Sequence, residues 1–213
     1  MQKIKGQTPL QECHDIATAK LLIEAGADVN VKDKKGNTLL HLDRYDPNVT
    51  KLLIDAGLDV NAKNYEGMTP LFCIADHDTS GDKDYVESAK LLIEAGADVN
   101  AQNKKGQTPL HLCLDENLAK LFIEAGADVN AKDHNGNTRL HAFIPCDDDC
   151  IDDYDAVDDA YYHLEGYIRV MKVLIEAGAD VNAKNNEGKT PLDLSGYYKV
   201  DDVLIKAGAI DQR

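Results

Sequence analysis

The apolar positions of this 213-residue chain follow one ten-residue pattern that occurs six times. Its fullest form, Leu-Leu-Ile-Glu-Ala-Gly-Ala-Asp-Val-Asn, occupies 21–30 and 91–100. Close copies lie at 52–61, 121–130 and 173–182, and a more divergent copy lies at 203–211. The Leu-Leu-Ile run supplies an apolar helix face, and the Gly after it suits the left-handed residue that ends a helix. Six copies of one string predict a repeat architecture.

A second string, Gly-x-Thr-Pro-Leu, precedes each copy and predicts a short first helix. It is complete at 6–10, 67–71, 106–110 and 188–192, whereas Leu39 and Arg139 replace the Pro in the other two copies. A Thr hydroxyl can accept from a free backbone N–H at a helix start, and Pro suits the first helical position. Each unit is therefore predicted to be helix, turn, helix and loop, with units starting near residues 6, 36, 67, 106, 136 and 188.

The spacing between the two strings is constant on one side and variable on the other. From the closing Gly to the next Thr the distance is always twelve residues: 26 to 38, 57 to 69, 96 to 108, 126 to 138 and 178 to 190. From the Thr to its own closing Gly it is 18, 19, 27, 18, 40 and 18 residues. Because neighbouring units must pack in constant register, we expect the loop between units to set that register.

The combination of these strings resembles the ankyrin repeat over essentially the whole chain, and Thr108-Pro109-Leu110-His111 is a complete copy of that family's helix start. The compact units here have 30 or 31 residues, against about 33 in the family. The resemblance implies an all-α ankyrin-repeat solenoid, a single domain over 1–213, with the twelve-residue loops forming β-hairpin-like projections. It also implies that the motif His bonds to backbone between repeats. That His is present as His41, His111 and His141, and is replaced by Gln11, Phe72 and Asp193.

The length variation comes from two acidic insertions, at about 76–87 and 145–167. The first holds five acids and one Lys, and the second holds nine acids and neither Lys nor Arg. Their net charges of −4 and −9 account for −13 of the formal −15 of the chain. An acidic chain of this kind disfavours nucleic acid and anionic membranes as partners, and a basic protein is its natural complement.

Two interpretations of the insertions stay open. As a docking surface, their carboxylates would steer a basic partner and their tyrosines would supply apolar contact. As solvated loops, they would be tolerated because the entropy cost of a loop grows slowly with its length. The longer insertion also predicts an extended second helix that starts at Asp158-Asp159 and presents an apolar face, although Gly166 argues against it. The predicted face comprises Leu164, Ile168, Met171 and Ile175.

Candidate chemistry is sparse. Cys146 and Cys150 near His141 and His163 suggest zinc, but the histidines match no standard arrangement, and packing explains Cys13, Cys73 and Cys113 better. No calcium loop, phosphate loop or hydrolase motif occurs, so neither a catalytic residue nor a cofactor or metal is predicted. The Asn of each Asp-Val-Asn resembles a residue that is hydroxylated in some ankyrin proteins, but ordering the loop is the favoured role. These residues are Asn30, Asn61, Asn100, Asn130 and Asn182.

The resemblance implies a protein–protein interaction module without catalytic activity, binding through the loop tips and the face of the first helices. The chain lacks a signal-like or membrane-length apolar run, and its five cysteines form no regular framework, so a cytoplasmic, monomeric protein is expected. Alternatives are an inhibitor or immunity protein that neutralises a basic toxin or nuclease, and the ankyrin part of a larger scaffold or host-directed effector. The predicted partner-binding residues are Lys34, Lys35, Tyr65, Glu66, Phe72, Lys104, Lys105, His134, Asp147, Asp148, Asp149, Asp152, Asp153, Tyr154, Tyr161 and Tyr162.

Overall fold

The computed structural model describes residues 8–11, 16–42, 46–75, 84–141 and 154–210, with the side chains of 154–163 also left undescribed. Within these ranges the chain forms helices, turns and loops without a strand, which confirms the predicted all-α ankyrin solenoid. The chain divides into two compact units, Met1–Lys104 and Lys105–Arg213, and each is described by itself. That the whole chain behaves as one domain stays a prediction.

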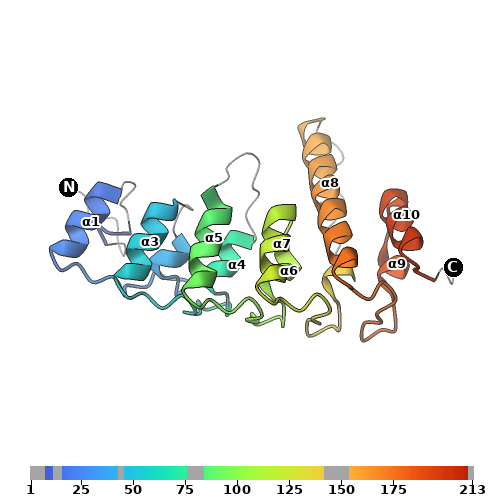
Figure 1. The fold of residues 1–213 in the computed structure, drawn as a ribbon, viewed down its shortest axis with the longest axis horizontal. Coiled ribbons are helices and arrows are strands. Elements are labelled where there is room, and N and C mark those ends of the chain that lie inside the picture. The colour runs from blue at the N-terminus through green and yellow to red at the C-terminus, as the bar shows by residue number, and fades with distance from the viewer. Residues whose placement is uncertain (1–7, 12–15, 43–45, 76–83, 142–153, 211–213) are drawn as a thin grey trace. The chain divides into compact units, whose positions relative to one another are not determined.

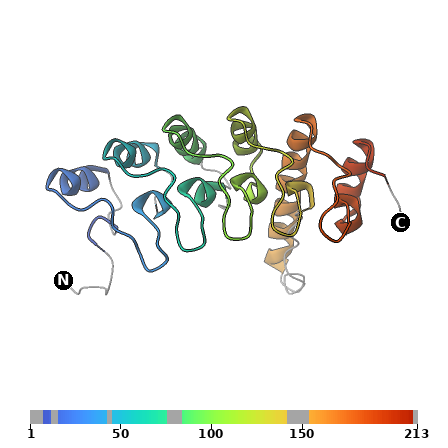
Figure 2. The ribbon, with the colours of Figure 1, turned by 90° about the horizontal axis from the view of Figure 1, so that it is seen from below.

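The first unit holds paired helices of unequal length (Figure 1). The second helices of its repeats form one row and the first helices form another, as Figure 2 shows from below. The first helices are short because the compact repeats leave few residues before the turn. The helices are α1 (Ile16–Glu24), α2 (Leu39–Leu42), α3 (Pro47–Asp55), α4 (Pro70–Ala75) and α5 (Asp84–Glu94).

The second unit repeats this arrangement with one long helix. Its α8 has 23 residues, whereas its neighbours α7 and α10 have nine each, and Figure 1 shows α8 extending past both. The core is built from small aliphatics such as Leu110, Leu118 and Leu174, each almost fully buried. The elements are α6 (Pro109–Leu112), α7 (Glu116–Glu124), the 3-10 turn η1 (Arg139–His141), α8 (Tyr154–Glu176), α9 (Pro191–Leu194) and α10 (Tyr198–Lys206).

Each twelve-residue loop is bonded to the next loop through its tip. In the first unit the Tyr65 N–H donates to the Lys35 carbonyl at 2.9 Å, and the Lys104 N–H donates to the Glu66 carbonyl at 2.9 Å. In the second unit the His134 N–H donates to the Lys105 carbonyl at 3.0 Å, and an equivalent bond joins the following pair of tips. One inserted residue in a loop would break these bonds, which explains the constant loop length.

The Asn of the Asp-Val-Asn string forms a second bridge between repeats. Asn61 donates from Nδ2 to the Gly96 carbonyl at 2.9 Å and accepts from the Asp98 N–H at 2.8 Å. Asn130 and Asn182 make the same pair of bonds to the repeat that follows each of them. The predicted loop-ordering role is confirmed at these three positions.

The tip glycines share a positive φ, and some of them are also crowded by the next loop. Gly106 has φ +77°, and a Cβ placed there would lie 2.5 Å from the His134 ring and 2.8 Å from its backbone nitrogen. Gly188 has φ +78°, but a Cβ there would meet nothing within 4 Å. The two positions therefore share one backbone conformation and differ in crowding.

We predict that Gly188→Ala lowers the free energy of unfolding by roughly 1–2 kcal/mol, the cost of a left-handed residue with a Cβ. Gly106→Ala should cost clearly more, because the next loop must also move away from the new methyl group. Urea unfolding followed by circular dichroism measures both losses. Equal losses would show that loop-to-loop contact at the tip contributes little.

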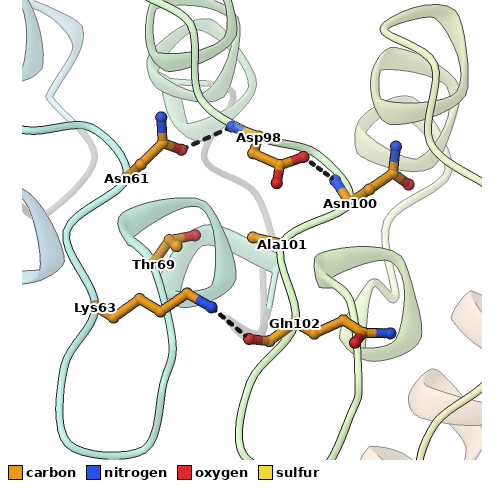
Figure 3. Close-up of a pocket in the computed structure, with 7 residues that line it drawn as sticks. All are labelled: Asn61, Lys63, Thr69, Asp98, Asn100, Ala101 and Gln102. Carbon is orange, nitrogen blue, oxygen red and sulfur yellow. Dashed lines mark hydrogen bonds between the residues drawn. The ribbon is translucent and has the colours of Figure 1, made fainter.

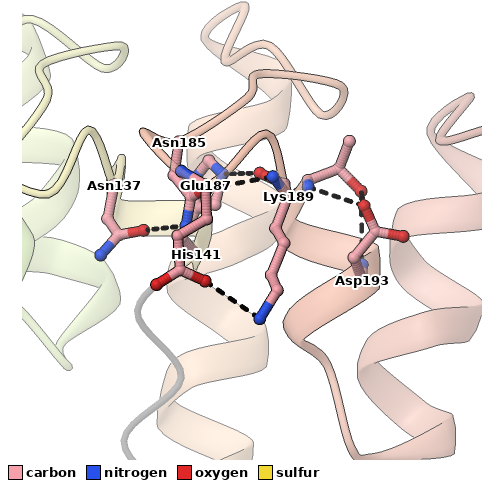
Figure 4. Close-up of polar contacts among 7 residues, drawn as sticks. Asn137, His141, Asn185, Glu187, Lys189 and Asp193 are labelled. Atoms are coloured by element: carbon pink, nitrogen blue, oxygen red, sulfur yellow. Dashed lines mark hydrogen bonds and ion pairs between the residues drawn. The ribbon is translucent and has the colours of Figure 1, made fainter.

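The three motif histidines connect repeats, as the family resemblance implied. In each, Nδ1 accepts from the backbone N–H of the Thr three residues earlier, at 3.1–3.2 Å. Nε2 therefore carries the proton and donates to a carbonyl of the next loop: Met68 for His41, Asn137 for His111 and Lys189 for His141. Figure 4 shows the contacts around His141. An imidazole that accepts at Nδ1 must be neutral, so these histidines are structural.

We predict that the protein loses stability as the pH falls from about 7.5 through 6.5. Burial lowers the pKa of His41, His111 and His141 in the folded chain, although their carbonyl partners oppose the shift. The unfolded chain, with histidine pKa values near 6.5, therefore takes up protons first. The urea midpoint should fall between pH 7.5 and 5.5.

Replacing all three residues by Gln should flatten this dependence. Gln is a natural control, because Gln11 already accepts from the Thr8 N–H at 2.9 Å at the same motif position. An equal fall in the urea midpoint of the parent and the triple variant would assign the pH dependence to other groups.

Candidate protein-binding surface

The predicted loop-tip residues of the first unit lie at turn corners with exposed side chains. Lys34 and Lys35 occupy one tip, Tyr65 and Glu66 the next, and Lys104 begins the third. Tyr65 is 62% exposed. In the second unit Lys105 and His134 are likewise exposed. These positions are accessible, and their role in binding stays a prediction.

The turn under each tip is held by an acidic or amide side chain. Asp33 accepts from the Lys35 N–H at 2.8 Å, the Asn37 N–H at 2.8 Å and the Asn37 side-chain amide at 3.0 Å. Burial would raise the pKa of Asp33, but these hydrogen bonds from Asn37 and Lys35 outweigh it and lower the pKa overall. Asn64 holds the next turn by the same two backbone bonds. The tips are therefore rigid platforms for their side chains.

The structure corrects the predicted partner-binding role of Phe72. It was predicted to contact a partner, but its side chain is fully buried in the helix layer of the first unit. A hydrophobic side chain at the motif-His position packs into the core instead of reaching the surface. It also leaves Thr69 Oγ1 buried without a hydrogen-bond partner among the described residues, whereas Thr38 Oγ1 pairs with His41 and Thr190 Oγ1 with Asp193. Phe72 is therefore removed from the candidate surface.

Most of the predicted acidic surface lies outside the described residues. This holds for Asp147, Asp148, Asp149, Asp152 and Asp153. Tyr154, Tyr161 and Tyr162 belong to the N-terminal part of α8, where the backbone is helical and the side chains are not described. Their roles stay predictions. The disfavoured zinc alternative is not tested either, because Cys146 and Cys150 lie outside the described residues and the side chain of His163 is not described.

The base of α8 is anchored by a buried arginine that the sequence analysis did not single out. Arg139 takes the place of the motif Pro and is 2% exposed. Its Nη2 donates to the Cys113 carbonyl at 2.9 Å, and its guanidinium carbon lies 5.1 Å from the ring centre of Tyr167. Burial lowers the pKa of Arg139, but a guanidinium keeps its charge in proteins. The signal was available, since Arg replaces Pro in the repeat that carries the longest insertion.

Two further residues of α8 complete this anchor. Tyr167 is the last residue of the longer insertion, whose tyrosines were predicted to contact a partner, but it is 2% exposed and donates its hydroxyl to the Leu140 carbonyl at 2.8 Å. Burial raises the pKa of Tyr167 to about 12, although Arg139 opposes the shift. Gly166 permits close packing, because a Cβ there would lie 3.0 Å from the Leu114 carbonyl oxygen. The predicted extended second helix is confirmed, but it begins at Tyr154, four residues before the predicted start, and Gly166 lies inside it.

An open hollow of about 460 Å³ lies between two loops of the first unit (Figure 3). Its polar groups are engaged internally: Lys63 Nζ donates to the Gln102 carbonyl at 2.9 Å, and Asn61 bonds to the Asp98 N–H. Ligand sites are mostly apolar with a few convergent polar groups. This hollow is instead a polar seam that joins two repeats, and we assign it no ligand.

Other chemistry was sought in the described ranges. They contain no group of three His, Cys, Asp or Glu residues placed to hold a metal ion. Nor do they contain a helix long and apolar enough to span a membrane. Cys113 is fully buried, donates to the Asp115 carbonyl, and has a pKa raised by burial to about 12, so it is an unreactive packing residue.

We predict that Arg139 and Tyr167 stabilise the second unit as a coupled pair. In a double-mutant cycle of Arg139→Met and Tyr167→Leu, the coupling in unfolding free energy should be about 1–2 kcal/mol, because the cation and the ring are both desolvated. Urea unfolding of the four proteins measures it. Tyr198→Leu is the control partner, since Tyr198 is 79% exposed. Coupling no larger than that of the control would mean that Arg139 does not anchor α8.

Comparisons with known proteins identify the family to which the chain belongs. A family model described as ankyrin repeats (3 copies) matches residues 10–103 and 79–152, and an ankyrin repeat model matches residues 135–186. Among solved structures, the fold is similar to the crystal structure of the ankyrin repeat domain of Bcl-3, described as a unique member of the IkappaB protein family. The TM-score is 0.68 and the sequence identity 29%, covering 93% of this chain and 82% of that one. A comparison with curated proteins gives no match. The chain belongs to the ankyrin repeat family.

Proposed function

We propose that this chain is a protein-recognition module whose acidic insertions bind a partner with a basic surface. Ankyrin repeats are generally protein–protein interaction modules and typically non-catalytic, which supplies the coarse function. The finer statement rests on charge, because the two insertions account for −13 of the formal −15. A basic toxin or nuclease that this chain neutralises is the narrower form of the proposal.

The observation that carries the proposal is the anchored α8. The helix continues 14 residues beyond the length of α7 and α10, which is about 21 Å at 1.5 Å per residue. A buried Arg139, a buried Tyr167 hydroxyl and a glycine at the contact hold its base. Long insertions without secondary structure are either functional or disordered, and a helix fixed by buried polar contacts favours function.

One part of the insertion is not available to a partner. Glu165 pairs with Lys199 at 3.0 Å between α8 and α10, and both side chains are about one-third exposed. Within the longer insertion, the proposal therefore assigns partner binding to the acidic residues that precede Glu165. They are Asp147, Asp148, Asp149, Asp152, Asp153, Asp155, Asp158 and Asp159.

We predict that removing four insertion charges weakens partner binding while leaving the fold intact. The test variant changes Asp147, Asp148, Asp149 and Asp152 to Asn. The matched control changes Glu24, Glu94, Glu124 and Glu176 to Gln, four exposed acids at the ends of second helices. Both variants shift the net charge by four, so they differ only in where the charge is lost.

The measurement is a quantitative pull-down from lysate of the native host at about 0.15 M and 0.5 M salt, with circular dichroism as the folding check. A partner should be retained by the parent and the control, lost by the insertion variant, and weakened by salt, because exposed charges are screened over about 8 Å at 0.15 M. A partner retained equally by both variants would refute the acidic-docking proposal.

A further inference from the structure

The loop tips of the first unit form a surface of opposite sign to the insertions. We call Lys34, Lys35, Tyr65, Glu66 and Lys104 the loop-tip surface. All five side chains are exposed. No ion pair between described residues involves the three lysines, which outnumber the single exposed Glu66. The nearby Asp33 carboxylate, which accepts three hydrogen bonds within its own turn, keeps its charge and attracts Lys35, so three lysines against Glu66 and Asp33 leave a net charge of +1. The surface therefore presents a local excess of positive charge on an acidic chain.

Tyr65 gives this surface an apolar centre that is already held in place. Its ring lies against Gly36, where a Cβ would come within 2.7 Å of Cδ1 and 2.8 Å of Cε1. The residue is nevertheless 62% exposed, so part of the ring remains open to a partner. A tyrosine has few rotatable bonds, so ordering it on binding costs little entropy, and tyrosines are frequent at interface hot spots.

The described acids of the shorter insertion lie at the far end of α5 from the tips. Asp84 and Glu87 are in the first turn of α5, whereas the loop that leads to Lys104 follows the C-terminus of that helix. The eleven residues of α5 span about 16 Å, which is about twice the screening length at physiological salt. These two carboxylates are therefore screened from Lys104.

The spacing of the tips indicates the shape of a complementary ligand. Single backbone hydrogen bonds of 2.9 Å join Tyr65 to Lys35 and Lys104 to Glu66, so the lysine pair and Lys104 lie on opposite sides of the Tyr65–Glu66 tip. An extended chain rises about 3.3 Å per residue, so side chains three residues apart span about 10 Å. Carboxylates at that spacing would reach the lysine pair at one end and Lys104 at the other.

We propose that the loop-tip surface binds an extended acidic segment of a partner protein, with carboxylates on the lysines and an apolar side chain on Tyr65. The proposal rests on the proposed function as a recognition module, but it assigns a second surface and a partner chemistry of the opposite charge. Nucleic acid is the less suitable polyanion, because phosphate binding needs many cations and the rest of the chain is strongly acidic.

The probe is a fluorescein-labelled peptide, Gly-Ser-Glu-Glu-Phe-Glu-Glu-Ser-Gly, whose glutamates recur at a spacing of three. Fluorescence anisotropy measures its affinity for the full chain at about 0.15 M and 0.5 M salt. A peptide with Gln in place of every Glu is the charge control. We expect the acidic peptide to bind, the Gln peptide to bind at least about tenfold more weakly, and salt to weaken the complex.

Variants of the protein locate the binding. Lys34→Glu with Lys35→Glu should weaken binding about tenfold or more, Tyr65→Ala should weaken it several-fold, and Glu66→Gln should strengthen it. The matched control is Lys51→Glu with Lys90→Glu, which reverses two exposed lysines on α3 and α5 and should change affinity by less than about twofold. Equal weakening by both double variants would show a general field effect and overturn the proposal.

Three further results would overturn it. One is tighter binding of a single-stranded oligonucleotide of equal charge. Another is equal binding of the Gln peptide. The last is self-association of the chain that the Lys34→Glu and Lys35→Glu changes abolish, which would identify a second copy as the occupant. The insertion variant with four Asp→Asn changes should keep full peptide affinity, so failure of the acidic-docking proposal and failure of this one are distinguishable.

Discussion

The backbone hydrogen bond from one loop tip to the next is the constraint on which the rest of this fold depends. It requires each loop to reach the same point beside its neighbour, which a loop of constant length achieves. The motif histidine and the Asp-Val-Asn asparagine add side-chain bonds across the same junctions, at the two ends of the loop. Each repeat therefore leaves its polar groups unsatisfied without its neighbour, which is the physical basis of nearest-neighbour stability in repeat proteins.

Because the loop between repeats has a fixed length, all length variation among the repeats falls between the two helices. The last turn of the second helix and the start of the first helix must stay in register with adjacent repeats, whereas residues can be added at the opposite ends of the helices without moving the loops. The repeat with the longest insertion also has a changed residue in its core. Arg139 replaces the motif Pro. Its guanidinium contacts the Tyr167 ring of α8 and the Cys113 carbonyl. The insertion thus changed the core at its base as well as the surface.

The repeat frame, the loop positions and the histidine bonds were predictable from the sequence because each follows from a local string that recurs. The start of α8 was not, because aspartates, which suit a helix N-terminus, recur at 152–153, 155 and 158–159, so several starting points fit the sequence. Phe72 and Tyr167 were misassigned for a related reason. Aromatic side chains suit both interfaces and cores, and only the packing of neighbouring helices decides between them. Arg139 had a local signal, because it replaces the motif Pro, but its bond to the Cys113 carbonyl and its contact with Tyr167 depend on the tertiary packing.

A binding surface on hydrogen-bonded loop tips has an energetic advantage that follows from the same constraint. The backbone of each tip is ordered during folding by bonds to its neighbours, so a partner that docks there pays little further backbone entropy. The side chains are free to differ from repeat to repeat, because the bonds use only main-chain atoms and the turn residues beneath them. Lysine pairs, a tyrosine and a histidine can therefore occupy equivalent tips without disturbing the stack. The recurring strings specify the stack, and the non-recurring residues at the tips and in the insertions are left to specify the partner.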